Sequence, residues 1–265
     1  DFDNAKRIIK SIKGIELSDE QLEAVKCALS SGVSVITGGP GTGKTTIVKS
    51  IMWALEQVGA SVILAAPTGR AAKRLSLATG HEASTIHRLL EYGYSEDESN
   101  LSFSRDEHNQ LDCDVLIVDE MSMVDVVLMS HLLKALPSEC RLILVGDSDQ
   151  LPSVSAGNVL HDIINSGCVT IKRLTQIYRQ AQQSLIVVNA HRINKGETIE
   201  LYNRESDFFF VKQTTPESAI STLIAMATER IPNFIACNPL KDIQILSPIK
   251  KSDLGVFNLN KVLQN

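Results

Sequence analysis

The sequence predicts an α/β protein built around a parallel sheet. Short runs of aliphatic and β-branched residues alternate along the chain with amphipathic stretches, as in strands joined by crossover helices. The runs contain almost no polar residues, which is typical of strands that are buried on both faces. They lie at residues 33–37, 61–66, 115–118 and 141–145.

Helical patterns separate these runs. They cover residues 19–30, 44–58, 69–78 and 124–136. Ser18 precedes the first pattern and has the side chain of an N-cap, while Gly59 is placed to end the second. The alternation predicts one doubly wound domain that covers residues 1–174.

Residues 91–113 interrupt this rhythm. They are polar, with an acidic group at 96–98, and Leu101 and Phe103 stand two positions apart. This pattern predicts a small hairpin inserted in the first domain. A solvated acidic loop is the alternative.

A second α/β set is predicted after residue 174. Strands are expected at 208–211 and 243–246, and helices at 183–194 and 217–230. These elements are few for a closed sheet. We therefore assign residues 175–265 to a partial second domain.

Composition excludes several classes of protein. The chain has 265 residues, of which 43% are hydrophobic and 22% charged, as in an ordinary globular protein. Its net charge of −5 excludes a surface that is basic throughout, so any nucleic-acid groove has to be local. The five cysteines include no Cys-x-x-Cys pair, and no apolar run approaches the roughly 20 residues of a membrane span. A cytoplasmic protein without a membrane partner is expected.

A glycine-rich segment joins the run at 33–37 to the following helical pattern. Residues 38–45 read Gly-Gly-Pro-Gly-Thr-Gly-Lys-Thr, the pattern of a phosphate-binding loop. Glycines let successive N–H groups point at phosphate oxygens, and the helix adds its positive end. Lys44 is placed to bind the β- and γ-phosphates of ATP, and the Thr45 hydroxyl to ligate Mg²⁺. The predicted ATP-binding residues of the loop are Gly39, Pro40, Gly41, Thr42, Gly43, Lys44, Thr45 and Thr46.

Polar side chains also follow two later strands. Asp119 and Glu120 come directly after the run at 115–118, where Asp119 would hold Mg²⁺ and Glu120 would polarise the attacking water. Gln150 follows the run at 141–145, and its amide can sense the γ-phosphate by hydrogen bonding. These features alone fit a motor, a small-molecule kinase or a signalling GTPase.

Further motifs separate these classes. Residues 17–21 read Leu-Ser-Asp-Glu-Gln, 66–72 Ala-Pro-Thr-Gly-Arg-Ala-Ala, 85–88 Thr-Ile-His-Arg, 119–122 Asp-Glu-Met-Ser, 146–154 Gly-Asp-Ser-Asp-Gln-Leu-Pro-Ser-Val and 174–180 Leu-Thr-Gln-Ile-Tyr-Arg-Gln. Together they resemble superfamily 1 DNA helicases, most closely the RecD-like branch. The resemblance implies a RecA-like P-loop NTPase fold with a partial second RecA-like α/β domain.

The resemblance also implies roles for particular residues. Gln21 would lie against the adenine edge, and Arg179 would act as an arginine finger, completing a predicted catalytic set with Lys44, Asp119, Glu120 and Gln150. Contacts to single-stranded DNA are carried over to Thr68, Arg70, Thr85 and His87. A surface salt bridge is the alternative for Arg179, and a residue without a DNA contact is the alternative for His87.

The function that the resemblance implies is ATP-dependent DNA unwinding, with 5′ to 3′ movement on single-stranded DNA and roles in DNA repair and recombination. Subunits of a nuclease–helicase assembly are expected partners. The later motifs of the family have no counterpart in these residues, so the chain by itself is expected to bind nucleotide but hydrolyse it weakly. A nucleotide-switched DNA-binding or loading module that does not unwind DNA is the alternative.

Overall fold

The computed structural model describes residues 17–94, 101–176, 183–201 and 207–264. The chain divides into two compact units on either side of residues 201–208. Each unit is described separately below. The predicted domain boundary after residue 174 stays a prediction.

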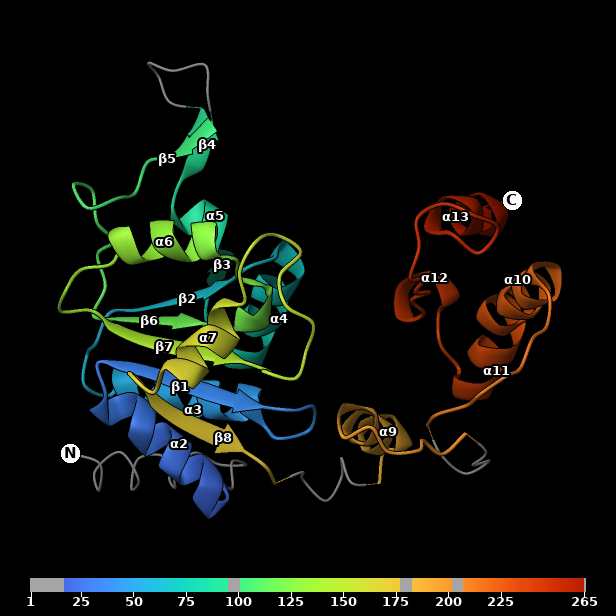
Figure 1. Cartoon of the computed structure of the whole chain (residues 1–265), viewed down its shortest axis with the longest axis horizontal. Coiled ribbons are helices and arrows are strands. Elements are labelled where there is room, and N and C mark those ends of the chain that lie inside the picture. The colour runs from blue at the N-terminus through green and yellow to red at the C-terminus, as the bar shows by residue number, and fades with distance from the viewer. Residues whose placement is uncertain (1–16, 95–100, 177–182, 202–206, 265) are drawn as a thin grey trace. The chain divides into compact units, whose positions relative to one another are not determined.

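The first unit is built on a six-stranded sheet whose order is β3-β2-β6-β7-β1-β8 (Figure 1). All its neighbouring strands run parallel. This arrangement brings the carboxyl ends of β1, β7 and β6 to one edge, where ligands of such sheets bind. The strands are β1 (Val33–Gly38), β2 (Val62–Ala66), β3 (Ala83–Thr85), β6 (Val115–Val118), β7 (Arg141–Gly146) and β8 (Thr170–Leu174).

Helices cover both faces of the sheet. Alternate strand side chains enter separate hydrophobic clusters, with Val35 in one and Ile36 in the other. The cluster around Ile36 includes residues of α2 (Asp19–Ser30), α3 (Lys44–Glu56) and α4 (Gly69–Thr79). The other cluster includes residues of α5 (Ile86–Leu89), α6 (Val126–Lys134) and α7 (Val159–Ser166). The sheet is therefore buried on both sides, as its apolar strands predict.

The elements predicted for the first unit are confirmed, with small changes at their ends. The Ser18 hydroxyl accepts a hydrogen bond from the Gln21 N–H and caps α2. The helix expected at 124–136 starts at Val126, because Asp125 caps it, and a short 3₁₀ helix, η1 (Met121–Met123), comes before. Two strands were not predicted. β3 is only three residues long, and β8 carries Lys172 and Arg173 at the edge of the sheet.

The hairpin predicted within residues 91–113 is confirmed. β4 (Tyr92–Tyr94) and β5 (Leu101–Phe103) pair antiparallel, with Tyr92 opposite Phe103. Figure 1 shows the hairpin beyond α5 and α6, on the side away from the sheet. The acidic residues at 96–98 lie outside the described residues.

The helix expected at 183–194 is present as α9 (Leu185–Asn194), which belongs to the first unit. The part of the second unit that the structure describes is helical. It comprises α10 (Pro216–Ala225), the π-helix η2 (Met226–Arg230), α11 (Ile231–Ile235), α12 (Pro239–Asp242) and α13 (Val256–Gln264).

The strands predicted at 208–211 and 243–246 are wrong for this structure. Both segments have irregular backbone. A β-rich run becomes a strand only when another strand pairs with it, and neither run has such a partner among the described residues. Phe209, Phe210 and Val211 are instead exposed.

No helix among the residues described above is both long enough and apolar enough to cross a membrane.

Candidate nucleotide-binding site

The glycine-rich loop curls between the end of β1 and the start of α3. Gly41 and Gly43 have φ angles of 77° and 81°, in the left-handed region that favours glycine. The buried Thr42 hydroxyl donates to the Gly39 carbonyl at 2.8 Å and closes the curl. Gly43 is the N-cap of α3, so the positive end of that helix faces the loop. The backbone therefore has the form that the sequence predicts for an anion-binding loop.

Other segments approach two further glycines closely. A Cβ atom on Gly38 would lie 2.8 Å from Cβ of Leu174, at the end of β8. A Cβ atom on Gly39 would lie 2.6 Å from Cε1 of His191, whose Nε2 is 3.3 Å from the Pro40 carbonyl oxygen. α9 thus places an imidazole against the loop. His191 was not predicted as a site residue, because a single histidine in a helical pattern carries no signal.

Lys44 is folded back onto its own loop. Its ammonium group donates to the Gly38 carbonyl and, at 3.1 Å, to the Gly39 carbonyl. Burial lowers the pKa of Lys44, and the charges of Asp147, Glu120 and Asp119 act against that effect. The cation therefore lies within electrostatic reach of acids from two other strands. This is the position from which it can move onto phosphate oxygens.

The end of β6 supplies the predicted carboxylates. Asp119 is buried, and that burial raises the pKa of its carboxyl, with the neighbouring Glu120 charge adding to the rise. Asp119 Oδ1 accepts the Glu120 N–H at 2.9 Å. The Glu120 carboxylate forms an ion pair with Arg74 of α4. Glu120 also has φ 56° and ψ 41°, a left-handed conformation that is uncommon outside glycine and clusters at functional sites.

The end of β7 adds an acid that was not predicted as a site residue. Asp147 is buried and acts on Lys44 more strongly than Asp119 or Glu120 does. Its carboxylate accepts the Asp149 N–H at 3.0 Å and the Gln150 side-chain amide at 3.4 Å. Gln150 is exposed. The signal for Asp147 was available, since it follows an apolar strand as Asp119 does.

Gln21 lies directly beside the loop. Its side-chain amide donates to the Thr42 carbonyl at 3.2 Å, while its Oε1 accepts the Ser18 N–H at 3.1 Å. The bond from Ser18, together with the Gln21 N–H that donates to the Ser18 hydroxyl, forms a capping box at the start of α2. The buried residue predicted to face adenine therefore also supports the backbone of the loop.

The residues predicted to touch DNA begin helices at the carboxyl ends of neighbouring strands β2 and β3. Thr68 caps α4 by accepting the Ala71 N–H, and Thr85 caps α5 by accepting the Arg88 N–H. Arg70 is exposed in the first turn of α4. The structure thus brings Thr68, Arg70 and Thr85 to one sheet edge, whereas Arg179 lies outside the described residues.

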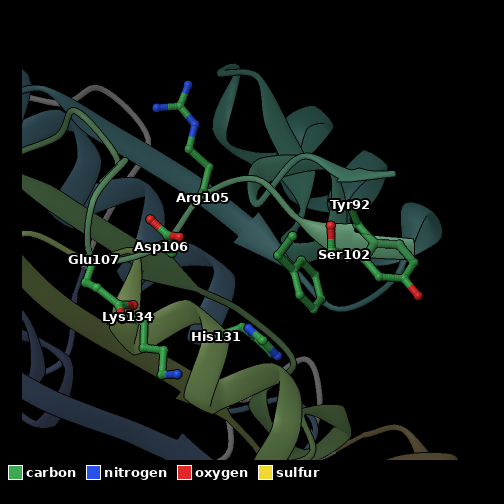
Figure 2. Close-up of a pocket in the computed structure, with 8 residues that line it drawn as sticks. Tyr92, Ser102, Arg105, Asp106, Glu107, His131 and Lys134 are labelled. Atoms are coloured by element: carbon green, nitrogen blue, oxygen red, sulfur yellow. The ribbon is translucent and has the colours of Figure 1, made fainter. Parts of the chain in front are cut away.

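His87 lies under the hairpin. Its ring is 5.5 Å from the Tyr92 ring and 5.9 Å from the Phe103 ring, between centroids. A pocket of about 470 Å³ lies beside Phe103. Figure 2 shows His131 and Lys134 reaching it from α6, and Tyr92 and Ser102 from the hairpin. The pocket is lined by Tyr92, Ser102, Phe103, Arg105, Asp106, Glu107, His131 and Lys134.

The fold and this edge of the sheet define the class of the chain, which is a P-loop nucleotide-binding protein with a RecA-like parallel sheet. A model of the AAA domain family matches residues 21–156. The chain belongs to this family.

Curated relatives narrow the class further. The ATP-dependent RecD2 DNA helicase of Deinococcus radiodurans is 38% identical over 255 residues, covering 96% of this chain and 33% of that protein. The RecBCD enzyme subunit RecD of Mycobacterium tuberculosis is 33% identical over 282 residues, covering 93% of this chain and 48% of that protein. The predicted resemblance to RecD-like helicases is confirmed. The chain spans about a third to a half of the length of these relatives.

A solved structure supports the fold. The crystal structure of Pif1 helicase from Candida albicans matches with a TM-score of 0.51 and 23% identity, covering 83% of this chain and 55% of that chain. The mixed α/β fold with a RecA-like parallel sheet is thereby confirmed.

Proposed function

We propose that the protein containing this chain is a RecD-like helicase that uses ATP hydrolysis to move along single-stranded DNA and unwind duplexes. One observation carries the proposal. The ends of β6 and β7 bring Asp119, Glu120 and Asp147 within electrostatic reach of Lys44, which follows β1. The next strands of the same sheet, β2 and β3, end at the predicted DNA contacts. A nucleotide site and a strand path thus share one sheet edge.

The side chains present fit ATP with Mg²⁺. The Thr45 hydroxyl and the Asp119 carboxylate are oxygen donors of the kind that Mg²⁺ prefers, and Mg²⁺ would neutralise charge on the phosphates. Lys44 would leave its loop carbonyls for the β- and γ-phosphates. Glu120 would accept a proton from the attacking water.

Residues farther from the loop complete the proposed ATP site. The exposed Gln150 amide, held near β7 by Asp147, would bond to the γ-phosphate and report its loss. Arg179 would supply a guanidinium to the transition state from outside the first sheet. Gln21, which lies beside the loop, would face the edge of adenine.

The proposed DNA path runs over the first turns of α4 and α5. Thr68, Arg70, Thr85 and His87 would contact phosphates, which positions a strand without reading its sequence. Movement in the 5′ to 3′ direction and assembly with nuclease–helicase subunits are further parts of the proposal. The assembly is supported by the name of one relative, a RecBCD enzyme subunit, whereas the direction rests on the resemblance to RecD-like helicases alone.

The test uses the longest reading frame that contains this chain. ATP hydrolysis is measured with and without single-stranded DNA, and unwinding with duplexes that carry a 5′ or a 3′ tail. We expect strong stimulation by DNA and unwinding of the 5′-tailed duplex, with both lost in Lys44→Ala. Stimulation without unwinding of either duplex would instead identify a nucleotide-switched DNA-binding module.

A further inference from the structure

The ion pair between Arg74 and Glu120 has no role in the site described so far. Arg74 comes from α4, whereas Glu120 follows β6 and is the residue proposed to activate water. Two other constraints already act on Glu120. Its backbone is left-handed, and its N–H is bonded to Asp119 Oδ1. The Arg74 pair adds a third constraint, and it is the only one of these that acts on the carboxylate itself.

The path of the chain explains why α4 reaches this carboxylate. β2 and β6 are parallel neighbours, with Ala65 paired to Val118, so their carboxyl ends lie side by side. α4 begins three residues after β2 ends. Helix side chains lean toward the helix N-terminus, so the Arg74 guanidinium points back to the sheet edge where Glu120 lies.

Arg74 stands on the helix that carries predicted DNA contacts. Arg70 is four residues earlier, which places the two arginines on one face of α4. The Arg74 side chain is 64% exposed, whereas that of Glu120 is only 17% exposed. An anionic ligand arriving over α4 would therefore meet the guanidinium before it met the carboxylate.

The pair also affects what Glu120 can do. The guanidinium is bonded to Oε1 of the Glu120 carboxylate, so this oxygen is turned toward Arg74 and is not available to accept a proton from water. Exposed ion pairs contribute little stability. A phosphodiester can match the guanidinium with two parallel hydrogen bonds, and this is enough to compete with such a pair.

Resting on the function proposed above, we propose that Arg74 is a positioning residue which holds Glu120 back in the absence of DNA and releases it when a backbone phosphate binds Arg74. The ligand class is thus the phosphodiester of a single strand. ATP hydrolysis is therefore slowed in the absence of DNA, and DNA binding removes this restraint.

The test compares Arg74→Gln with Arg74→Lys in the same full-length protein. Lys73→Gln is the matched control, since Lys73 is an exposed cation on the same helix. We expect Arg74→Gln to raise the DNA-independent rate about two- to fivefold, the range that a weak ion pair allows. The stimulation ratio should fall by a similar factor. The DNA-independent rate of Arg74→Lys should lie between those of Arg74→Gln and the unaltered protein. The rate of Lys73→Gln should equal that of the unaltered protein.

A DNA-independent rate of Arg74→Gln that equals or falls below that of the unaltered protein would overturn the proposal. If DNA fails to stimulate the unaltered protein, the proposed function fails, yet the comparison of DNA-independent rates still decides whether Arg74 restrains Glu120. The two failures are therefore distinguishable.

A second measurement does not depend on activity. Thermal unfolding of Arg74→Gln, Glu120→Gln and the double variant, without nucleotide, reports whether the two side chains are coupled. We expect the double variant to lose no more in Tm than the more affected single variant, and the coupling to vanish with single-stranded DNA present. Additive losses, or coupling that persists with DNA, would contradict the proposal.

Discussion

At the scale of a single residue, Asp119 shows how a buried side chain of the candidate site can lower the stability of the folded protein. Burial raises the pKa of its carboxyl in the folded chain. A carboxyl of this kind stabilises the fold while it is protonated, and that contribution is lost as the pH rises through the folded pKa. Burial therefore opposes the charged form of Asp119, which is the form proposed to hold Mg²⁺.

We therefore expect Asp119→Asn to abolish hydrolysis and to raise Tm at pH 7 by about 2–4 °C, the shift that roughly 1 kcal/mol produces in a domain of this size. The gain should shrink as the pH falls toward the ordinary carboxyl range. Thermal melts at several pH values measure this. The exposed Asp112→Asn serves as the control, and an equal gain at every pH would contradict the explanation.

Cys113 illustrates the same effect of burial outside the site. Burial and the adjacent Cys140 thiol, 3.5 Å away between sulfur atoms, raise the pKa of Cys113 to about 12. Because the thiolate is the nucleophile, Cys113 should resist iodoacetamide at pH 8 while the exposed Cys168 reacts. Mass spectrometry of the alkylated peptides measures both. Equal alkylation of the two thiols would show that the Cys113 thiol is not buried beside Cys140.

At the scale of elements, the cap of α2 is linked to the nucleotide loop. Ser18→Ala removes the acceptor for the Gln21 N–H and should destabilise the protein by about 1 kcal/mol. It also loosens the first turn of α2, which carries Gln21 and its hydrogen bond to the Thr42 carbonyl. We expect a two- to threefold weaker binding of a fluorescent ATP analogue, roughly 0.5 kcal/mol.

The chain offers a matched control for this prediction. Thr215 forms a capping box of the same kind at the start of α10, in the other unit. Thr215→Ala should lower stability without changing nucleotide binding. If the two variants weaken nucleotide binding equally, the link from cap to loop is refuted.

The hairpin depends on one aromatic side chain. The Phe103 ring lies 4.7 Å from that of Tyr92 and 4.4 Å from that of His131, between centroids. Phe103→Ala should therefore loosen β4 and β5 from α6. We expect proteolysis within residues 91–105 to speed up about tenfold while nucleotide binding stays unchanged. An unaltered cleavage rate would mean that backbone pairing alone holds the hairpin.

Strands made almost entirely of apolar residues were predictable from the sequence. β1, β6 and β7 were found because a strand buried on both faces is an unbroken apolar run. β3 and β8 were missed because edge strands need only one buried face and so keep polar residues. The runs at 208–211 and 243–246 failed for the converse reason, since β propensity without a neighbouring strand leaves backbone groups unpaired.

The site was predictable where one segment carries the chemistry. The loop at 38–45 has its own pattern, and Asp119 is identified by the strand before it. The contacts of His191 with the loop and of Arg74 with Glu120 join segments far apart in sequence. Only the folded positions of α9 and α4 create those contacts.

At the scale of the whole molecule, the two main hydrophobic clusters close within one stretch of chain. Their buried residues run from Ala24 to Leu174. Residues 17–176 expressed alone should therefore fold and unfold in one cooperative thermal transition. Circular dichroism and calorimetry measure this, and a broad transition would show that α9 is needed to complete the fold.

The hydrogen bonds of Lys44 to its own loop have a consequence for turnover. A lysine that is already satisfied must exchange two carbonyl partners for phosphate, so the net gain on binding is smaller than for a free cation. The same carbonyls take the ammonium back once the γ-phosphate has been cleaved and the products loosen. Affinity for the nucleotide is thereby exchanged for a short residence time, which the proposed motor function requires of its ATP site.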